Sequence, residues 1–85
     1  MNKKEIKDVL MQVLQDTLWV DMEVAQNPQS SLRGDLGFDS LDQIEICLLL
    51  EKRLDISIPD KEADNVKTVG DVIDLLDRTI NKVPA

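Results

Sequence analysis

Two segments of the 85-residue chain space their apolar residues at intervals of three and four, the period of one buried face of an α-helix. The first segment runs from Lys3 to Leu18, and the second follows Thr68, a residue type that commonly caps a helix. A third segment, Ser40 to Leu54, holds strong helix formers and neither glycine nor proline. These patterns predict three main helices, and the sequence shows no sign of a sheet.

The connections between these segments differ in length. Between Trp19 and Asp39 the helical pattern stops, and the stretch NPQSSLRGDLG, residues 27–37, is rich in turn formers. The connection exceeds the length of about two to eight residues common between packed helices, so we expect it to pack on the core. After the third segment, residues 59–66 have room for one short helix. The prediction is an all-α domain over residues 1–85, a small bundle of three main helices plus one short helix, with a long loop between the first and second helices.

The chain is acidic, with 17 Asp and Glu against 10 Lys and Arg and a formal net charge of −7. A negative net charge disfavours binding to nucleic-acid backbones and favours binding to partners with basic patches. No stretch reaches the roughly 20 apolar residues of a membrane span. With no histidine and one cysteine, Cys47, neither an internal disulfide nor a zinc-type ligand set is expected. We expect a cytoplasmic monomer without a metal site, in which Cys47 is a small core residue.

The missing histidine also bears on Ser40, the one hydroxyl in GFDSLDQI, residues 37–44. A serine nucleophile in an enzyme commonly depends on a neighbouring imidazole that takes its proton. We therefore do not expect the chain to be an enzyme. The simplest structural role for Ser40 is a helix cap, since Ser40 and Gln43 have the spacing of a capping box.

The helix predicted from Ser40 to Leu54 carries two apolar faces at about 100° per residue. In one interpretation the helix is central and buried all round. However, acidic residues flank one of the faces, and ionised groups are rarely buried unpaired. We therefore expect Ile46, Leu50 and Leu54 to point into the core and the other face to be an exposed docking surface. The apolar residues of that second face are Leu41, Ile44 and Leu48.

Ser40 stands at the start of this helix, where free backbone N–H groups and the helix dipole favour a phosphate group. A phosphodiester on its hydroxyl would point away from the protein. The chemistry of such a protein would lie in what is attached to it.

The stretch DLGFDSLDQIEICLLLEKRLDISIPD, Asp35 to Asp60, resembles the acyl carrier proteins of fatty acid and polyketide synthesis. Their hallmark is Asp-Leu-Gly, one variable residue and then Asp-Ser-Leu, and residues 35–41 match every fixed position. The resemblance implies a freestanding carrier whose Ser40, flanked by Asp39 and Leu41, receives 4′-phosphopantetheine from coenzyme A. A phosphopantetheinyl transferase would attach this group, and its terminal thiol would carry acyl groups as thioesters.

The resemblance also implies partners and their contacts. The partners would be a ketosynthase, reductases, a dehydratase and acyltransferases of fatty acid or polyketide synthesis. We expect a dynamic acyl-chain cleft between the helix of residues 40–54 and the last helix, at Ile46, Leu50 and Ile73. The residues implied in partner binding combine acids with the exposed apolar positions, and they are Asp39, Leu41, Asp42, Ile44, Glu45, Leu48 and Glu51.

Some residues depart from the family pattern. Arg33, Gly34, Lys52 and Arg53 lie where acidic residues are common, which affects the prediction of partner enzymes and leaves the attachment motif intact. Two alternatives stay open. One is a carrier for another cargo, such as an aminoacyl group, and the other is a non-carrier acidic helical interaction module in which Ser40 only caps.

Overall fold

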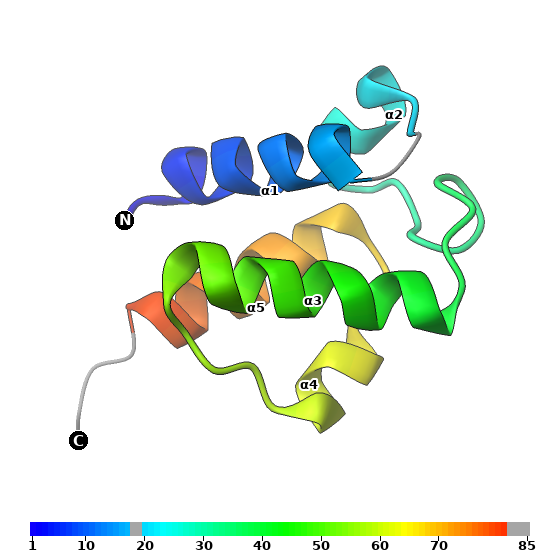
Figure 1. Ribbon diagram of the computed structural model, residues 1–85. Coiled ribbons are helices and arrows are strands. Elements are labelled where there is room, and N and C mark those ends of the chain that lie inside the picture. Colours follow the sequence, from blue (N-terminus) through cyan, green and yellow to red (C-terminus); the bar gives the residue numbers. More distant parts are fainter. Residues whose placement is uncertain (18–19, 82–85) are drawn as a thin grey trace.

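The computed structural model describes residues 1–17 and 20–81. Within these ranges the chain forms five helices and no extended strand (Figure 1). They are α1 (Lys3–Thr17), α2 (Met22–Gln26), α3 (Ser40–Leu54), α4 (Asp60–Asn65) and α5 (Val69–Ile80). The all-α prediction is confirmed, with α1, α3 and α5 as the three main helices and α4 as the predicted short one. None of the helices in these two ranges is long and apolar enough to cross a membrane.

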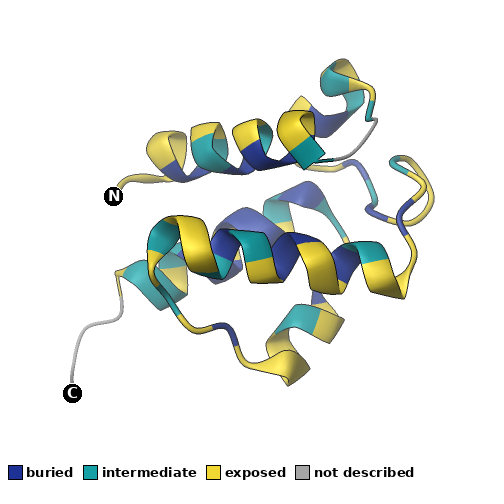
Figure 2. Cartoon of the chain, in the orientation of Figure 1, coloured by how far each residue is buried: buried dark blue, intermediate teal, exposed yellow. Residues whose placement is uncertain are grey.

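The three main helices pack around one aliphatic core. α1 contacts both α3 and α5, and α4 contacts α3 on the side away from α1 (Figure 1). Figure 2 shows the buried residues on the sides of the helices that face one another. This pattern follows from the apolar spacing of three and four, which gathers one face of each helix for burial. The largest fully buried side chains are Ile6, Leu10, Leu14, Leu50, Val69, Leu75 and Leu76.

The connection between α1 and α3 contains a helix that the sequence pattern did not predict. α2 has five residues, and Asp21 caps it by accepting a hydrogen bond from the Glu23 N–H at 3.0 Å. Five residues are too few to display a helical period, so this part of the long-loop prediction is corrected. The prediction that the connection packs on the core is confirmed by Ala25 and Leu32, which are buried. Leu18, the predicted end of the first helix, lies outside the described residues.

The second half of the connection is tied to the start of α5. The Leu32 N–H donates to the Lys67 carbonyl at 2.8 Å, and the Val69 N–H donates to the Ser30 carbonyl at 3.0 Å. The Ser30 side chain, itself buried, donates from Oγ to the Val24 carbonyl at 2.7 Å. These bonds satisfy buried backbone groups. They also hold the loop so that residues 33–39 run toward the start of α3.

Candidate functional site

α3 begins at Ser40, but its cap is the residue before. Asp39 Oδ1 accepts from the Asp42 N–H at 2.9 Å, and Asp42 Oδ2 accepts from the Asp39 N–H at 3.2 Å. The prediction that Ser40 caps the helix with Gln43 is therefore wrong by one residue. An aspartate carboxylate caps as well as a serine hydroxyl, and two candidate caps stand side by side here. The hydroxyl of Ser40 is left free of any capping role.

The turn before α3 places Ser40 on the surface. Gly37 has φ +74°, a left-handed conformation that glycine adopts without steric cost. After this turn Phe38 is buried, with 6% of its surface exposed, and its N–H donates to the Leu32 carbonyl at 2.8 Å. Asp39 and Ser40 follow and are exposed. Phe38, in the variable slot of the motif, thus anchors the turn in the core, and Ser40 lies outside.

A side chain from the preceding loop reaches Ser40. Arg33 Nη2 donates to Ser40 Oγ at 2.9 Å, and Arg33 Nε donates to Gln43 Oε1 at 3.0 Å. Gln43 is buried and donates from Nε2 to the Val66 carbonyl at 3.3 Å. We call Arg33, Ser40, Gln43 and the Val66 carbonyl the Arg33 network. Sequence reasoning noted Arg33 only as a departure from the family, because no short-range pattern links residues 33, 43 and 66.

An exposed apolar strip runs along α3 from the site. Leu41 is 75% exposed, Ile44 48% and Leu48 55%, and we call these three residues the exposed strip. Figure 2 shows exposed positions along the outer side of α3. The prediction that this face is exposed is confirmed, as is the core-facing stripe, in which Ile46 and Leu50 are buried and Leu54 is half-buried against the core. A strip of this kind with charged neighbours suits protein docking.

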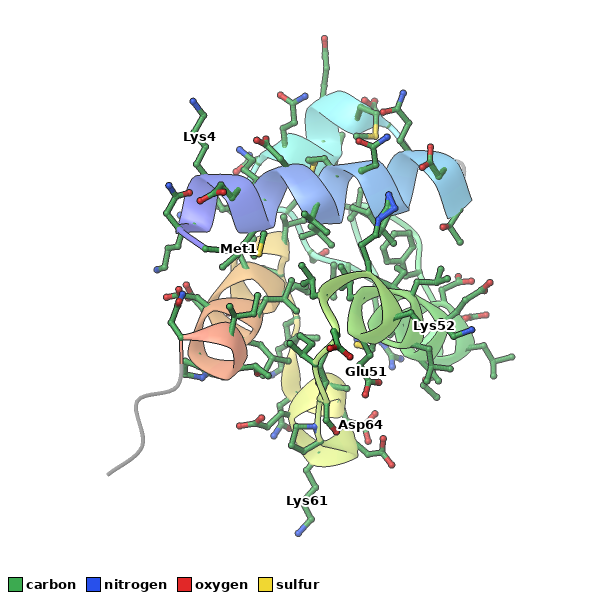
Figure 3. All side chains as sticks on the ribbon, turned by 60° about the vertical axis from the view of Figure 1, so that its left-hand side comes forward. Met1, Lys4, Glu51, Lys52, Lys61 and Asp64 are labelled. Atoms are coloured by element: carbon green, nitrogen blue, oxygen red, sulfur yellow. The ribbon has the colours of Figure 1, made fainter. Side chains whose placement is uncertain are left out.

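The acids predicted to meet partners have different local roles. Glu45 is exposed on α3, whereas Asp39 and Asp42 cap each other's backbone. Glu51 is half-buried, and its Oε2 accepts from the Ile58 N–H at 3.2 Å. In Figure 3 Glu51 points from α3 toward the segment before α4, and Lys52 points outward. Glu51 therefore holds the chain that follows α3 in addition to presenting a charge.

A groove of about 260 Å³ lies between α3 and α4, beside the exposed strip. Glu51 and Asp64 line it from its two sides (Figure 3). Its other lining residues are Ile44, Cys47, Leu48, Ile58, Asp60 and Ala63. The groove thus joins apolar side chains of α3 to the acidic surface of α4.

The core behind this groove holds a cavity of about 20 Å³, room for roughly one water molecule. Of the three residues predicted for an acyl-chain cleft, Ile46 lines this cavity. Leu50 and Ile73 are buried but are not among its lining residues. A cleft that holds an acyl chain would need more room than this small cavity, so the cleft stays a prediction.

Cys47 lies between the groove and the cavity and lines both. Burial, together with the nearby Glu51 and Asp64 carboxylates, raises the pKa of its thiol to about 11. The thiol therefore stays protonated at neutral pH and is a poor nucleophile. The described residues include no group of three or more His, Cys, Asp and Glu side chains arranged to hold a metal ion.

Comparison with known proteins identifies the family. The family described as "Phosphopantetheine attachment site" matches residues 8–76. An acyl carrier protein of Thermosynechococcus vestitus is 41% identical over 85 residues, which covers 100% of both chains. This chain belongs to the acyl carrier protein family. An acyl carrier protein of Syntrophobacter fumaroxidans is 37% identical over 67 residues, covering 79% of this chain and 82% of its own length.

A solved structure supports the same assignment. The chain is similar to a candidate acyl carrier protein from Mycobacterium tuberculosis, with a TM-score of 0.63 and 31% identity over 87% of this chain and 92% of the other. Acyl carrier proteins are carriers rather than catalysts, and the matched domain is their phosphopantetheine attachment site. They work with a phosphopantetheinyl transferase and the enzymes of fatty acid synthesis, their usual role. The resemblance predicted from the Asp35 to Asp60 stretch is confirmed.

Proposed function

We propose that Ser40 carries the 4′-phosphopantetheine of this acyl carrier protein. The observation that supports this residue most strongly is that its hydroxyl is exposed at the first position of α3, while Asp39 supplies the cap. The helix has no local need for a hydroxyl there. The helix start also suits the phosphate of the attached group, because backbone N–H groups and the helix dipole favour an anion.

The attachment forms a phosphoester bond to Ser40 and breaks the pyrophosphate bond of coenzyme A. Ser40 Oγ forms a bond to the coenzyme A phosphorus that bears pantetheine, and the bond from this phosphorus to adenosine 3′,5′-bisphosphate breaks. The hydroxyl proton leaves with the help of the transferase, because this chain has no histidine to accept it. The attached group supplies a terminal thiol for thioesters. The chain itself is thus a carrier and not an enzyme.

Partner enzymes would recognise α3. The exposed strip offers apolar contact area, while Asp39, Asp42, Glu45 and Glu51 offer negative charge beside it. Charge complementarity of this kind mainly raises the association rate and weakens with salt. The proposed partners are a ketosynthase, reductases, a dehydratase and acyltransferases. The carrier would meet them as a monomer in the cytoplasm. The acyl chain would enter between α3 and α5 at Ile46, Leu50 and Ile73, after the core opens.

Intact mass spectrometry of the parent protein and its Ser40→Ala variant tests the attachment site. Both are incubated with coenzyme A and a broad-specificity phosphopantetheinyl transferase. We expect one phosphopantetheine on the parent and none on the variant. Because Ser40 does not cap α3, the variant should unfold in urea within about 0.5 kcal/mol of the parent.

Two results would contradict the proposal. Addition to the Ser40→Ala variant would place the group on another residue. No addition to the folded parent, with the transferase active on a control carrier, would favour the acidic interaction module instead.

A further inference from the structure

Arg33 reaches the attachment serine from outside α3. Its guanidinium contacts Ser40 Oγ through Nη2 and Gln43 Oε1 through Nε. Neither of the two ion pairs found among residues 1–17 and 20–81, Lys3 with Asp74 and Arg53 with Asp16, involves Arg33. In a chain with a formal charge of −7, this guanidinium is thus directed at a neutral hydroxyl.

The position of Arg33 is set by a buried side chain. Gln43 is 8% exposed, and its Nε2 donates to the Val66 carbonyl. That bond leaves Gln43 Oε1 facing the guanidinium, because the two ends of an amide have opposite hydrogen-bonding roles. Arg33 itself is exposed. A long, exposed side chain is therefore anchored at Nε, with its Nη2 end directed to Ser40.

Two carboxylates near Ser40 oppose the attraction that the helix start offers to a further negative charge. Asp39 and Asp42 form the capping box on either side of it along the chain. A phosphodiester on Ser40 would bring one further negative charge to this place, and like charges at short range repel. Arg33 supplies the compensating positive charge. A guanidinium also matches phosphate geometry, since its planar fork donates two parallel hydrogen bonds.

We propose that Arg33 holds the phosphodiester once Ser40 is modified, so that the prosthetic arm leaves the protein in a restricted direction. Arg33 is a positioning residue for the arm and takes no part in the chemistry of its thiol. This inference rests on the proposed attachment at Ser40. It concerns only how the attached phosphate is held.

Phosphorus NMR of the modified protein tests the proposal. The parent, Arg33→Gln and Arg53→Gln are each modified in full, as checked by intact mass. Arg53→Gln is the matched control, since it also removes one positive charge from an exposed arginine but lies at the far end of α3 from Ser40. We expect Arg33→Gln to shift the ³¹P signal and narrow it, because the phosphate moves more freely. Arg53→Gln should reproduce the parent signal.

Further measurements separate the alternatives. Arg33→Lys keeps the charge and loses the fork, so its ³¹P signal should lie between those of the parent and Arg33→Gln. If Arg33→Gln fails to fold, the parent alone is measured from about 20 mM to about 500 mM NaCl, where screening should move its ³¹P signal. Identical ³¹P shift and relaxation in the parent and folded Arg33→Gln, or no response of the parent to salt, would overturn the proposal. Failure of the attachment itself appears differently, as a parent without added mass.

Discussion

The starts of α3 and α5 are built alike and exposed differently. Each has a cap residue, with an aspartate three residues later whose carboxylate accepts a hydrogen bond from the cap N–H. Thr68 Oγ1 accepts from the Asp71 N–H at 3.1 Å, as Asp39 Oδ1 does from the Asp42 N–H at 2.9 Å. Both helices therefore begin on the same local chemistry.

The first helical residue after each cap shows the difference. Val69 in α5 is 0% exposed, whereas Ser40 in α3 is exposed. Loop backbone covers the start of α5, because the N–H groups of Val69 and Gly70 donate to the carbonyls of Ser30 and Pro28. At the start of α3 the hydrogen bond to Ser40 comes from the side chain of Arg33. A capping box thus fixes where a helix begins, and long-range packing decides whether that start is available for attachment.

Val69→Ala should have the largest effect on stability. It removes two buried methyl groups at a position with no exposed surface, which should lower the free energy of unfolding by about 2 to 3 kcal/mol. Urea denaturation measures this loss, with Ser40→Ala as the control at the equivalent position of α3. A loss for Val69→Ala no larger than for Ser40→Ala would show that the two starts are equally open.

Asp39→Ala and Thr68→Ala should each have a medium effect on the free energy of unfolding. Each removes the acceptor of a capping box, and such caps contribute about 1 kcal/mol. Comparison of Asp39→Ala with Ser40→Ala in the same urea experiment tests the assignment of the cap. If Ser40→Ala were the more destabilising of the two, Ser40 would be the cap, and its hydroxyl would have a structural reason to be there.

Asp71→Asn should have the smallest effect on the free energy of unfolding, and this effect should depend on pH. The hydrogen bond from the Lys67 N–H is the main cause that lowers the pKa of Asp71 below its ordinary 3.8, aided by Thr68 and opposed by slight burial. A carboxyl with a lowered folded-state pKa stabilises the fold above pH 3.8, and this contribution is lost as the pH falls through the folded value. The contribution is small because Asp71 is exposed.

Urea denaturation across a pH series measures the difference in unfolding free energy between the parent and Asp71→Asn. Asparagine keeps an acceptor for the Lys67 and Thr68 N–H groups, so Asp71→Asn isolates the charge. The parent should be more stable than the variant at pH of about 6, and the gap should narrow as the pH falls below 3.8. A gap that stays constant over this range would mean that the charge of Asp71 does not contribute.

The sequence predicted the site unevenly. Apolar spacing placed α1 and α5, helix-forming residues placed α3, and the flanking acids separated the exposed strip from the core side of α3, because each of these features lies within one helix. It did not place α2, which is too short to show a period. The capping-box spacing also assigned the cap of α3 to Ser40 instead of Asp39, since serine and aspartate both cap helices and these two residues are adjacent. The predicted cleft and partner contacts depend on motions and molecules beyond the fold, and they stay predictions.

The sequence by itself determined the three main helices and the short α4, the acidic charge and the match to the acyl carrier proteins, because these depend on residues that are close along the chain. Only the tertiary structure decided that the start of α5 is covered while that of α3 is open, and that Arg33 reaches Ser40. Those contacts join residues that lie from 7 to 42 positions apart in the chain, the latter being the bond from Gly70 to Pro28. Packing brings such residues together, and no local propensity encodes it.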